Sequence, residues 1–208
     1  MNTWSRRFRL LLLAGCLAAA GCDSILPPPQ VDPTRYYVLS GGGETGVPAA
    51  AGTLRLGLRT VDLAGYLQGR PMVVRHGANE LLIEDFHRWA EPLGDGVARA
   101  VRARLQADPA VGTVALQPFA FDAERDYDVA ISVLHCEGST VGDRGFASFA
   151  AVFEIRVPGP APRVVARRVF VAPDAAWDGR DFGQLASLLS NDVDALGNAI
   201  AAALPAAP

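Results

Sequence analysis

The sequence has few cysteines and no excess of basic residues, and both shortages exclude classes of protein. Two of its three cysteines, Cys16 and Cys22, lie in an N-terminal apolar segment. Cys136 therefore has no second thiol in the body of the chain with which to form a disulfide or a structural zinc site. The formal net charge is −3, which leaves no basic excess to neutralise the phosphates of nucleic acid.

Motifs of known catalytic sites are also lacking, since the sequence has no G-x-S-x-G, P-loop or dinucleotide-binding context. Of the three histidines, His76 is expected in a hairpin turn, and His87 with the acids at 84–85 in the solvated approach to a helix. His135 and Cys136 are neighbours in a strand, so they should point to opposite faces and share no proton. We predict no enzyme, no catalytic residue, no metal and no cofactor.

The N-terminus has the pattern of a secretion signal. Three arginines within residues 6–9 precede an apolar run at 10–20, which is too short to span a bilayer. The residues before Cys16 match a lipobox better, but a cut there leaves only a stub of the run, whereas Cys22 keeps all of it. We predict a signal peptide over 1–21 and a lipid on Cys22, the alternatives being Cys16 or an ordinary cleaved signal.

The mature chain is predicted to be one α/β domain on a tether. Residues 22–33 contain three consecutive prolines, which are typical of an extended linker. Alternating apolar residues predict strands over 35–39, 53–59, 72–75, 80–83, 113–117, 127–134, 147–157 and 164–171. Helical periodicity predicts a helix over 95–107 and a second that begins at an Asp181 cap. For residues 34–208 we expect an α/β sandwich, with a mixed, mostly antiparallel sheet and helices packed on it.

Several short elements resemble a known family when they are taken in order. They are the signal and its cysteine, Tyr36-Tyr37-Val38-Leu39, the Val61 to Leu67 turn with Arg70, Asn79-Glu80-Leu81, and Arg88-Trp89-Ala90-Glu91-Pro92-Leu93 before an arginine-rich helix. The same order is found in the ABC-type transport auxiliary lipoproteins, the family of paraquat-inducible protein C. The similarity extends over most of the mature chain.

The resemblance implies a non-enzymatic accessory of a lipid transport system. The expected partners are an inner-membrane ABC transporter and a mammalian-cell-entry-type (MCE) protein, and a homo-oligomer is compatible with this role. Only the lipid-bearing cysteine transfers from the family, onto Cys22, which implies anchoring at the periplasmic face of the outer membrane. Asp23 departs from this picture, because in some bacteria an aspartate after the cysteine retains a lipoprotein in the inner membrane.

Two other functions stay open, a periplasmic hydrolase with an undetected site and a structural envelope lipoprotein without a transport role. A polar pocket that joins His87 or His135 to an acid would favour the hydrolase, and an apolar groove would favour the accessory.

For the accessory we predict a partner-binding surface that includes Tyr66, Leu67, Arg70, Trp89 and Pro92, because these residues lie where loops join the predicted sheet to the first helix. The alternative for Trp89 is a core anchor, since tryptophan buries a large area.

Overall fold

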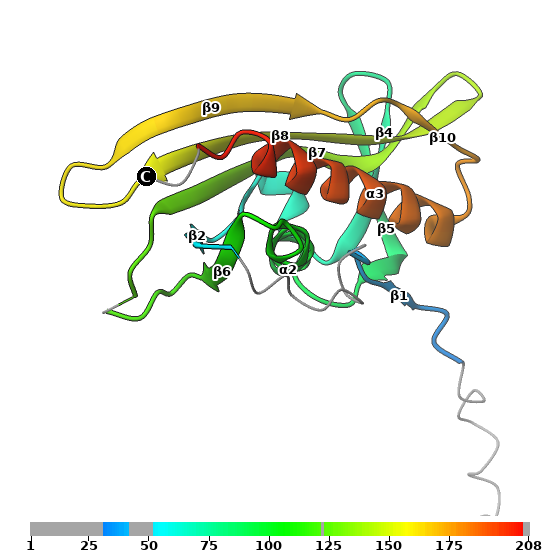
Figure 1. Ribbon diagram of the computed structural model, residues 1–208. Coiled ribbons are helices and arrows are strands. Elements are labelled where there is room, and N and C mark those ends of the chain that lie inside the picture. Colours follow the sequence, from blue (N-terminus) through cyan, green and yellow to red (C-terminus); the bar gives the residue numbers. More distant parts are fainter. Residues whose placement is uncertain (1–30, 42–51, 122, 206–208) are drawn as a thin grey trace, which may run out of the picture. The chain divides into compact units, whose positions relative to one another are not determined.

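A computed structural model describes residues 31–41, 52–121 and 123–205. The chain divides into two compact units, Met1–Pro33 and Thr34–Pro208. The strands and helices that the structure describes all belong to the second unit (Figure 1). The predicted signal peptide, Cys16, Cys22, Asp23 and the predicted tether up to residue 30 lie outside the described residues.

One curled sheet is the framework of the second unit. Ten strands are described in it: β1 (Arg35–Tyr37), β2 (Leu54–Leu58), β3 (Asp62–Leu63), β4 (Pro71–His76), β5 (Glu80–Trp89), β6 (Val111–Leu116), β7 (Tyr127–Val141), β8 (Arg144–Val157), β9 (Arg163–Val171) and β10 (Ala175–Trp177). The helices are α2 (Leu93–Gln106), α3 (Phe182–Ala201) and the short 3-10 helix η2 (Gly65–Leu67).

The long antiparallel hairpin β7–β8 runs through the middle of this sheet (Figure 1). The other edge of β7 pairs with β2, β3 and β4 in turn, all in parallel. The other edge of β8 pairs with β9 and β10, both antiparallel. Beyond these, β6 joins through β2, β5 through β4 and β1 through β5. All the other described strands are therefore joined to the β7–β8 hairpin, either directly or through neighbouring strands.

The sheet is mixed, and the expectation that it would be mostly antiparallel is wrong. The strand pairs β1–β5, β2–β6, β2–β7, β3–β7 and β4–β7 are parallel. Strands that follow one another through a tight turn are antiparallel, as predicted, but these five pairs join strands that are far apart in the chain and run in the same direction. The coarser prediction, one α/β domain with a mixed sheet and two helices, is confirmed.

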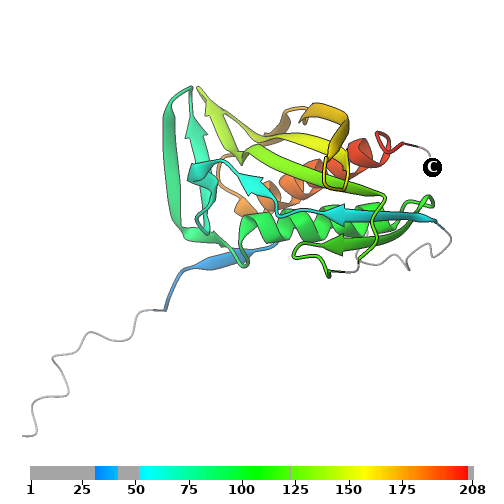
Figure 2. The same cartoon turned by 90° about the vertical axis from the view of Figure 1, so that its left-hand side faces the viewer.

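The two helices lie side by side (Figure 2). They approach closely, because a Cβ at Gly197 of α3 would lie within 2.9 Å of side-chain carbons of Arg104 on α2. The periodic residues of each helix form its buried face: Leu93, Val97, Val101 and Leu105 on α2, and Leu185, Leu189, Val193, Leu196 and Ile200 on α3. Asp181 caps α3 as predicted, since its side chain accepts hydrogen bonds from the backbone nitrogens of Gly183 and Gln184.

Candidate functional site

The first group of predicted contact residues lies around η2. Leu67 is only 3% exposed and belongs to the hydrophobic core, so the expectation of an exposed Leu67 is wrong. The 3-10 turn bends the chain after β3 back onto the sheet and directs this side chain inward. Tyr66 is half-buried, and Arg70 is exposed with its guanidinium donating to the carbonyl of Ala90 at 2.7 Å.

The second group forms the corner between β5 and α2. Trp89, the last residue of β5, is 3% exposed, which supports its alternative role as a core anchor. Pro92 is exposed and occupies the N-cap position of α2. The amide of Trp89 donates to the carbonyl of Arg70, and that of Ala90 to the carbonyl of Tyr37, both at 2.8 Å. Of the predicted surface, Arg70 and Pro92 are exposed and Tyr66 partly so.

The same corner contains an ion pair that the sequence analysis missed. The carboxylate of Glu91 accepts from the guanidinium of Arg99 at 2.6 Å, and the same nitrogen of Arg99 donates to the carbonyl of Leu39 at 2.7 Å. Arg99 of α2 thereby links the β5–α2 corner to the segment that follows β1. The Trp-Ala-Glu-Pro-Leu motif was the available signal, and the structure shows that the motif builds a corner of the fold.

His87 was predicted to lie before the helix in a solvated turn, and this prediction is wrong. It lies within β5, and its ring stacks on Phe182 of α3 with 3.9 Å between centroids. Glu84 is its acidic neighbour, with 3.5 Å between Nδ1 and Oε2. The apolar alternation of β5 ends at Ile83, so periodicity could not show that the strand continues to Trp89.

Cys136 and His135 differ in exposure as neighbours on a strand should. Cys136 is 2% exposed, whereas the side chain of His135 is 43% exposed. Burial raises the pKa of the Cys136 thiol, and the nearby carboxylates of Glu137 and Asp192 raise it further. A thiol that keeps its proton is a poor nucleophile, so this cysteine has no support for a catalytic role.

Glu137 on β7 is the centre of a polar cluster that the sequence analysis also missed. Its side chain is fully buried. Tyr66 donates its hydroxyl to Oε2 at 2.6 Å, and Arg75 of β4 donates Nε to Oε1 at 2.7 Å. The guanidinium of Arg75 also lies 5.4 Å from the centre of the Tyr66 ring. The cluster therefore joins η2, β4 and β7 through one carboxylate.

His135 completes this cluster at its exposed side. Its Nδ1 lies 3.1 Å from Oε1 of Glu137 and 3.3 Å from the Tyr66 hydroxyl, and the backbone nitrogen of Cys136 donates to Oε2 at 3.2 Å. The carboxylate has partners at both oxygens, and burial with the Glu137 hydrogen bond raises the pKa of Tyr66. A saturated carboxylate and a protonated phenol fit a structural network better than proton transfer.

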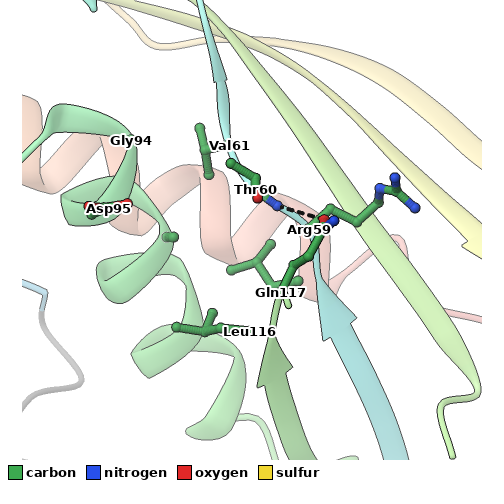
Figure 3. Close-up of a pocket in the computed structure, with 9 residues that line it drawn as sticks. Arg59, Thr60, Val61, Gly94, Asp95, Leu116 and Gln117 are labelled. Atoms are coloured by element: carbon green, nitrogen blue, oxygen red, sulfur yellow. Dashed lines mark hydrogen bonds between the residues drawn. The ribbon is translucent and has the colours of Figure 1, made fainter. Parts of the chain in front are cut away.

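A cavity of about 170 Å³ lies where the carboxyl ends of β2 and β6 meet the first turns of α2 (Figure 3). It is lined by Leu58, Arg59, Thr60, Val61, Gly94, Asp95, Ala98, Leu116 and Gln117. The backbone nitrogen of Thr60 donates to the side-chain oxygen of Gln117 at 3.2 Å across its floor. The volume is below the roughly 300–1,000 Å³ of pockets that bury drug-sized ligands. None of the histidines lines this cavity.

The described residues offer neither a membrane-spanning helix nor a metal site. In that part of the chain, no helix is long and apolar enough to cross a membrane. The same residues contain no group of three or more histidine, cysteine, aspartate or glutamate side chains that could hold a metal ion.

One family model matches most of the chain. The family model described as "ABC-type transport auxiliary lipoprotein component" matches residues 37–201, which include β2 to α3. A search of curated proteins gave no match.

Two crystal structures share this fold. One is a protein from Xanthomonas campestris, with a TM-score of 0.67 and 19% identity over 81% of this chain and 93% of that one. The other is an uncharacterized protein, with a TM-score of 0.61 and 15% identity over 81% of this chain and 97% of that one. At these identities the likeness shows the fold alone.

Proposed function

This chain belongs to the family of ABC-type transport auxiliary lipoprotein components, and from that premise we propose that it is a non-enzymatic, lipid-anchored accessory of an envelope transport system. The resemblance seen in the sequence is confirmed by the family match. The match over residues 37–201 is the single observation that carries the proposal. The saturated hydrogen bonding of Glu137 and the burial of the Cys136 thiol support the non-enzymatic part.

The partners we propose are an MCE-type protein and the inner-membrane ABC transporter of the same system, with lipids or other apolar molecules as cargo. The cavity beside α2 gives no support to carriage of lipid, because about 170 Å³ is too little for an acyl chain with its headgroup. The protein would then act by contact with other envelope proteins. Its exposed corner residues Arg70 and Pro92, with Tyr66 beside them, are the proposed contact surface.

Photo-crosslinking in intact envelopes tests this proposal. A photoreactive residue at Gln68, which is exposed between η2 and β4, should capture the MCE-type protein or the transporter. The same residue at Asp143, exposed in the β7–β8 turn, is the matched control and should not. Equal capture from both positions would show that contact is not specific to the corner near Gln68, and would contradict the proposed surface. Capture of neither partner from any exposed position would reject the proposed role.

Anchoring through Cys22 is the second part of the proposal, and mass spectrometry of the mature N-terminus tests it. The expected species begins at Cys22 and carries acyl chains, and Cys22→Ser should remove them, whereas Cys16→Ser should not. An acylated Cys16, or a mature chain with no lipid, would contradict it.

The proposed location is the periplasmic face of the outer membrane, with the inner membrane as the alternative because of Asp23. Separation of the two membranes on a density gradient decides between them. If Asp23 acts as a retention signal, the parent will fractionate with the inner membrane and Asp23→Ser will move it to the outer one.

A hydrolase is the second candidate function, since His135 and Glu137 do form an acid–histidine pair. The combined change His135→Gln and Cys136→Ala removes the exposed imidazole and the thiol. A folded variant of this kind should complement a deletion strain as well as the parent does. Loss of complementation with an unchanged melting temperature would favour the enzyme.

A further inference from the structure

Three exposed apolar side chains lie at one edge of the sheet, where β1 pairs with β5. Tyr36 lies opposite Arg88, two residues along β5 from Phe86, and Val38 directly follows β1. Each of the three is between 52% and 59% exposed. The members, which we call the β1–β5 patch, are Tyr36, Val38 and Phe86. Three large apolar groups exposed together on two neighbouring strands are more than the isolated exposed residues of an ordinary surface.

The register between β1 and β5 shows which of their side chains face the core and which face outward. Tyr37 lies opposite Trp89, and both side chains pack toward the core. Tyr36 lies opposite Arg88, one residue along, so these side chains point the other way. The inward face already has its cover from α3, whose Phe182 stacks on His87. The outward face has aromatic and aliphatic groups beside arginine.

Its place in the chain distinguishes this patch from the other apolar edge. Val169 and Val171 of β9 are also exposed, but β9 is at the far edge, five strand spacings from β1 in the order β1-β5-β4-β7-β8-β9. At roughly 4.8 Å for each spacing, the two edges are about 24 Å apart along the sheet. Along the chain, β1 is the strand that follows the segment from Cys22.

The length of that segment limits how far β1 can lie from a bilayer. Twelve residues, 23–34, separate Cys22 from the first residue of β1. Fully extended, they span at most about 40 Å, and a flexible chain spans less on average. With the lipid of Cys22 in the membrane, the patch is thus held at a high effective concentration beside the surface.

The side chains in the patch are those that favour a membrane interface. Tyrosine and phenylalanine rings with aliphatic neighbours enter the headgroup region, while exposed arginines such as Arg35 can reach the phosphates. Acidic residues at Glu80, Glu84 and Asp85 on β5 reduce any attraction to anionic lipid. Burial of apolar area would therefore supply most of the affinity, and the dependence on salt should be weak.

We propose that the β1–β5 patch is a membrane-contact surface, which lies against the bilayer that holds the lipidated Cys22 and so fixes how the domain stands on it. This inference rests on the proposed anchoring. A bilayer contact at β1 would direct the opposite edge of the sheet, β9, away from the membrane.

Tryptophan quenching by brominated lipid tests this orientation in the full mature lipoprotein. Phe86→Trp puts a reporter in the patch, and Val169→Trp puts a matched reporter on β9, where the side chain is 68% exposed. Trp89 and Trp177 are both 3% exposed and give a constant background. In vesicles of phosphatidylethanolamine and phosphatidylglycerol with brominated acyl chains, the reporter at 86 should be quenched at least twofold more than that at 169.

Equal quenching at the two positions, or none at position 86, would overturn the proposal. A shift of emission at position 86 with protein concentration, in the absence of lipid, would also overturn it, because a second copy would then cover the patch. Mass spectrometry separates a failure of anchoring from a failure of the patch. If Cys22 has no lipid, the soluble mature chains are added to the same vesicles, where preferential quenching at position 86 still supports the contact and its absence rejects it.

Discussion

The two halves of β7 are buried to a similar degree by opposite chemistry. In the first half, Val129, Ile131 and Val133 are at most 1% exposed and belong to the apolar core. In the second half, Glu137 is equally buried, but Arg75, Tyr66 and His135 surround its carboxylate. A break in register between Val133 and His135 separates them.

The difference shows what each half contributes to the domain. Apolar burial is not directional, so the first half can stabilise the sheet without specifying one partner. A buried carboxylate needs its donors in place, so the second half fixes where η2 and β4 lie relative to β7. Substitutions in the first half should therefore change stability most, and substitutions in the second half should also change the position of η2.

The largest expected effect is that of Ile131→Ala, in the apolar half. Ile131 is 1% exposed, and removing its side chain leaves a cavity between β7 and its neighbours. The free energy of unfolding should fall by about 2–5 kcal/mol, measured by denaturant titration. Val141→Ala, at the exposed end of the same strand, is the control and should change it little. A loss below 1 kcal/mol for Ile131→Ala would mean that this half is not the main core.

Next comes Glu137→Gln, which keeps the shape of the side chain and removes its charge. The amide can still accept from one donor, but Arg75 loses its ionic partner. We expect a loss of about 1–3 kcal/mol in the free energy of unfolding. Asp143→Asn in the exposed β7–β8 turn is the matched control. If Arg75→Met destabilises the parent and the Glu137→Gln variant equally, the two residues are not coupled.

Asp192 of α3 gives an effect of opposite sign, since its removal should stabilise the protein. Burial raises the pKa of Asp192 to about 6, above its ordinary 3.8. The folded state then binds the proton more tightly than the unfolded chain, so stability is lost as the pH rises from about 4 to about 6. Asp192→Asn should raise the free energy of unfolding at pH 7 by about 1–2 kcal/mol.

The pH profile is the check on this third prediction. The advantage of Asp192→Asn should shrink as the pH falls through 6 and vanish below about 4, where the parent carboxyl is protonated in both states. A constant difference between parent and Asp192→Asn at all pH values would contradict the assigned cause.

The smallest expected effect is that of Tyr66→Phe, which deletes one hydroxyl from the cluster. Its hydrogen bond to Glu137 is lost, and the free energy of unfolding should fall by about 0.5–1.5 kcal/mol. Tyr36→Phe, at an exposed hydroxyl, is the control. In a spectroscopic titration the pKa of Tyr66 should lie above the ordinary tyrosine value, because burial and Glu137 raise it. Ionisation of Tyr66 at the ordinary tyrosine pKa would mean that the cluster is open to water.

The same strand shows how far the sequence could predict the fold. Alternation predicted β7 from Tyr127 to Leu134, and the structure extends it to Val141. The predicted end coincides with the break in register at Val133 and His135, where the period of two is interrupted. Beyond this break the buried residues include polar ones, so no hydrophobic alternation marks the strand. Its continuation could be predicted only by knowing that Arg75 and Tyr66 lie beside Glu137.

Other features of the fold and of the candidate site were predictable only where they depend on residues close together in the sequence. Asp181 could be placed as a helix cap because its partners lie within three residues, and the β5–α2 corner could be found as a motif. The burial of Leu67 and the contact of His87 with Phe182 could not, since each depends on segments far apart in the chain. Local sequence patterns therefore predict individual helices and strands. The parallel pairing of strands and the buried clusters can be predicted only when the topology of the sheet is known.

The central place of β7 sets an order on the folding of a chain that is made from its N-terminus. β2, β3 and β4 all pair with residues of β7 that come roughly 60 to 70 positions later in the chain. Before residue 127 emerges, the β4–β5 hairpin, α2 and the β1–β5 and β2–β6 pairs can form, but none of them can join β7. The nascent chain therefore remains open through its first half and closes late, when β7, β8 and finally α3 become available. A premature stop before α3 would leave an uncovered apolar sheet, which is a substrate for chaperones and proteases.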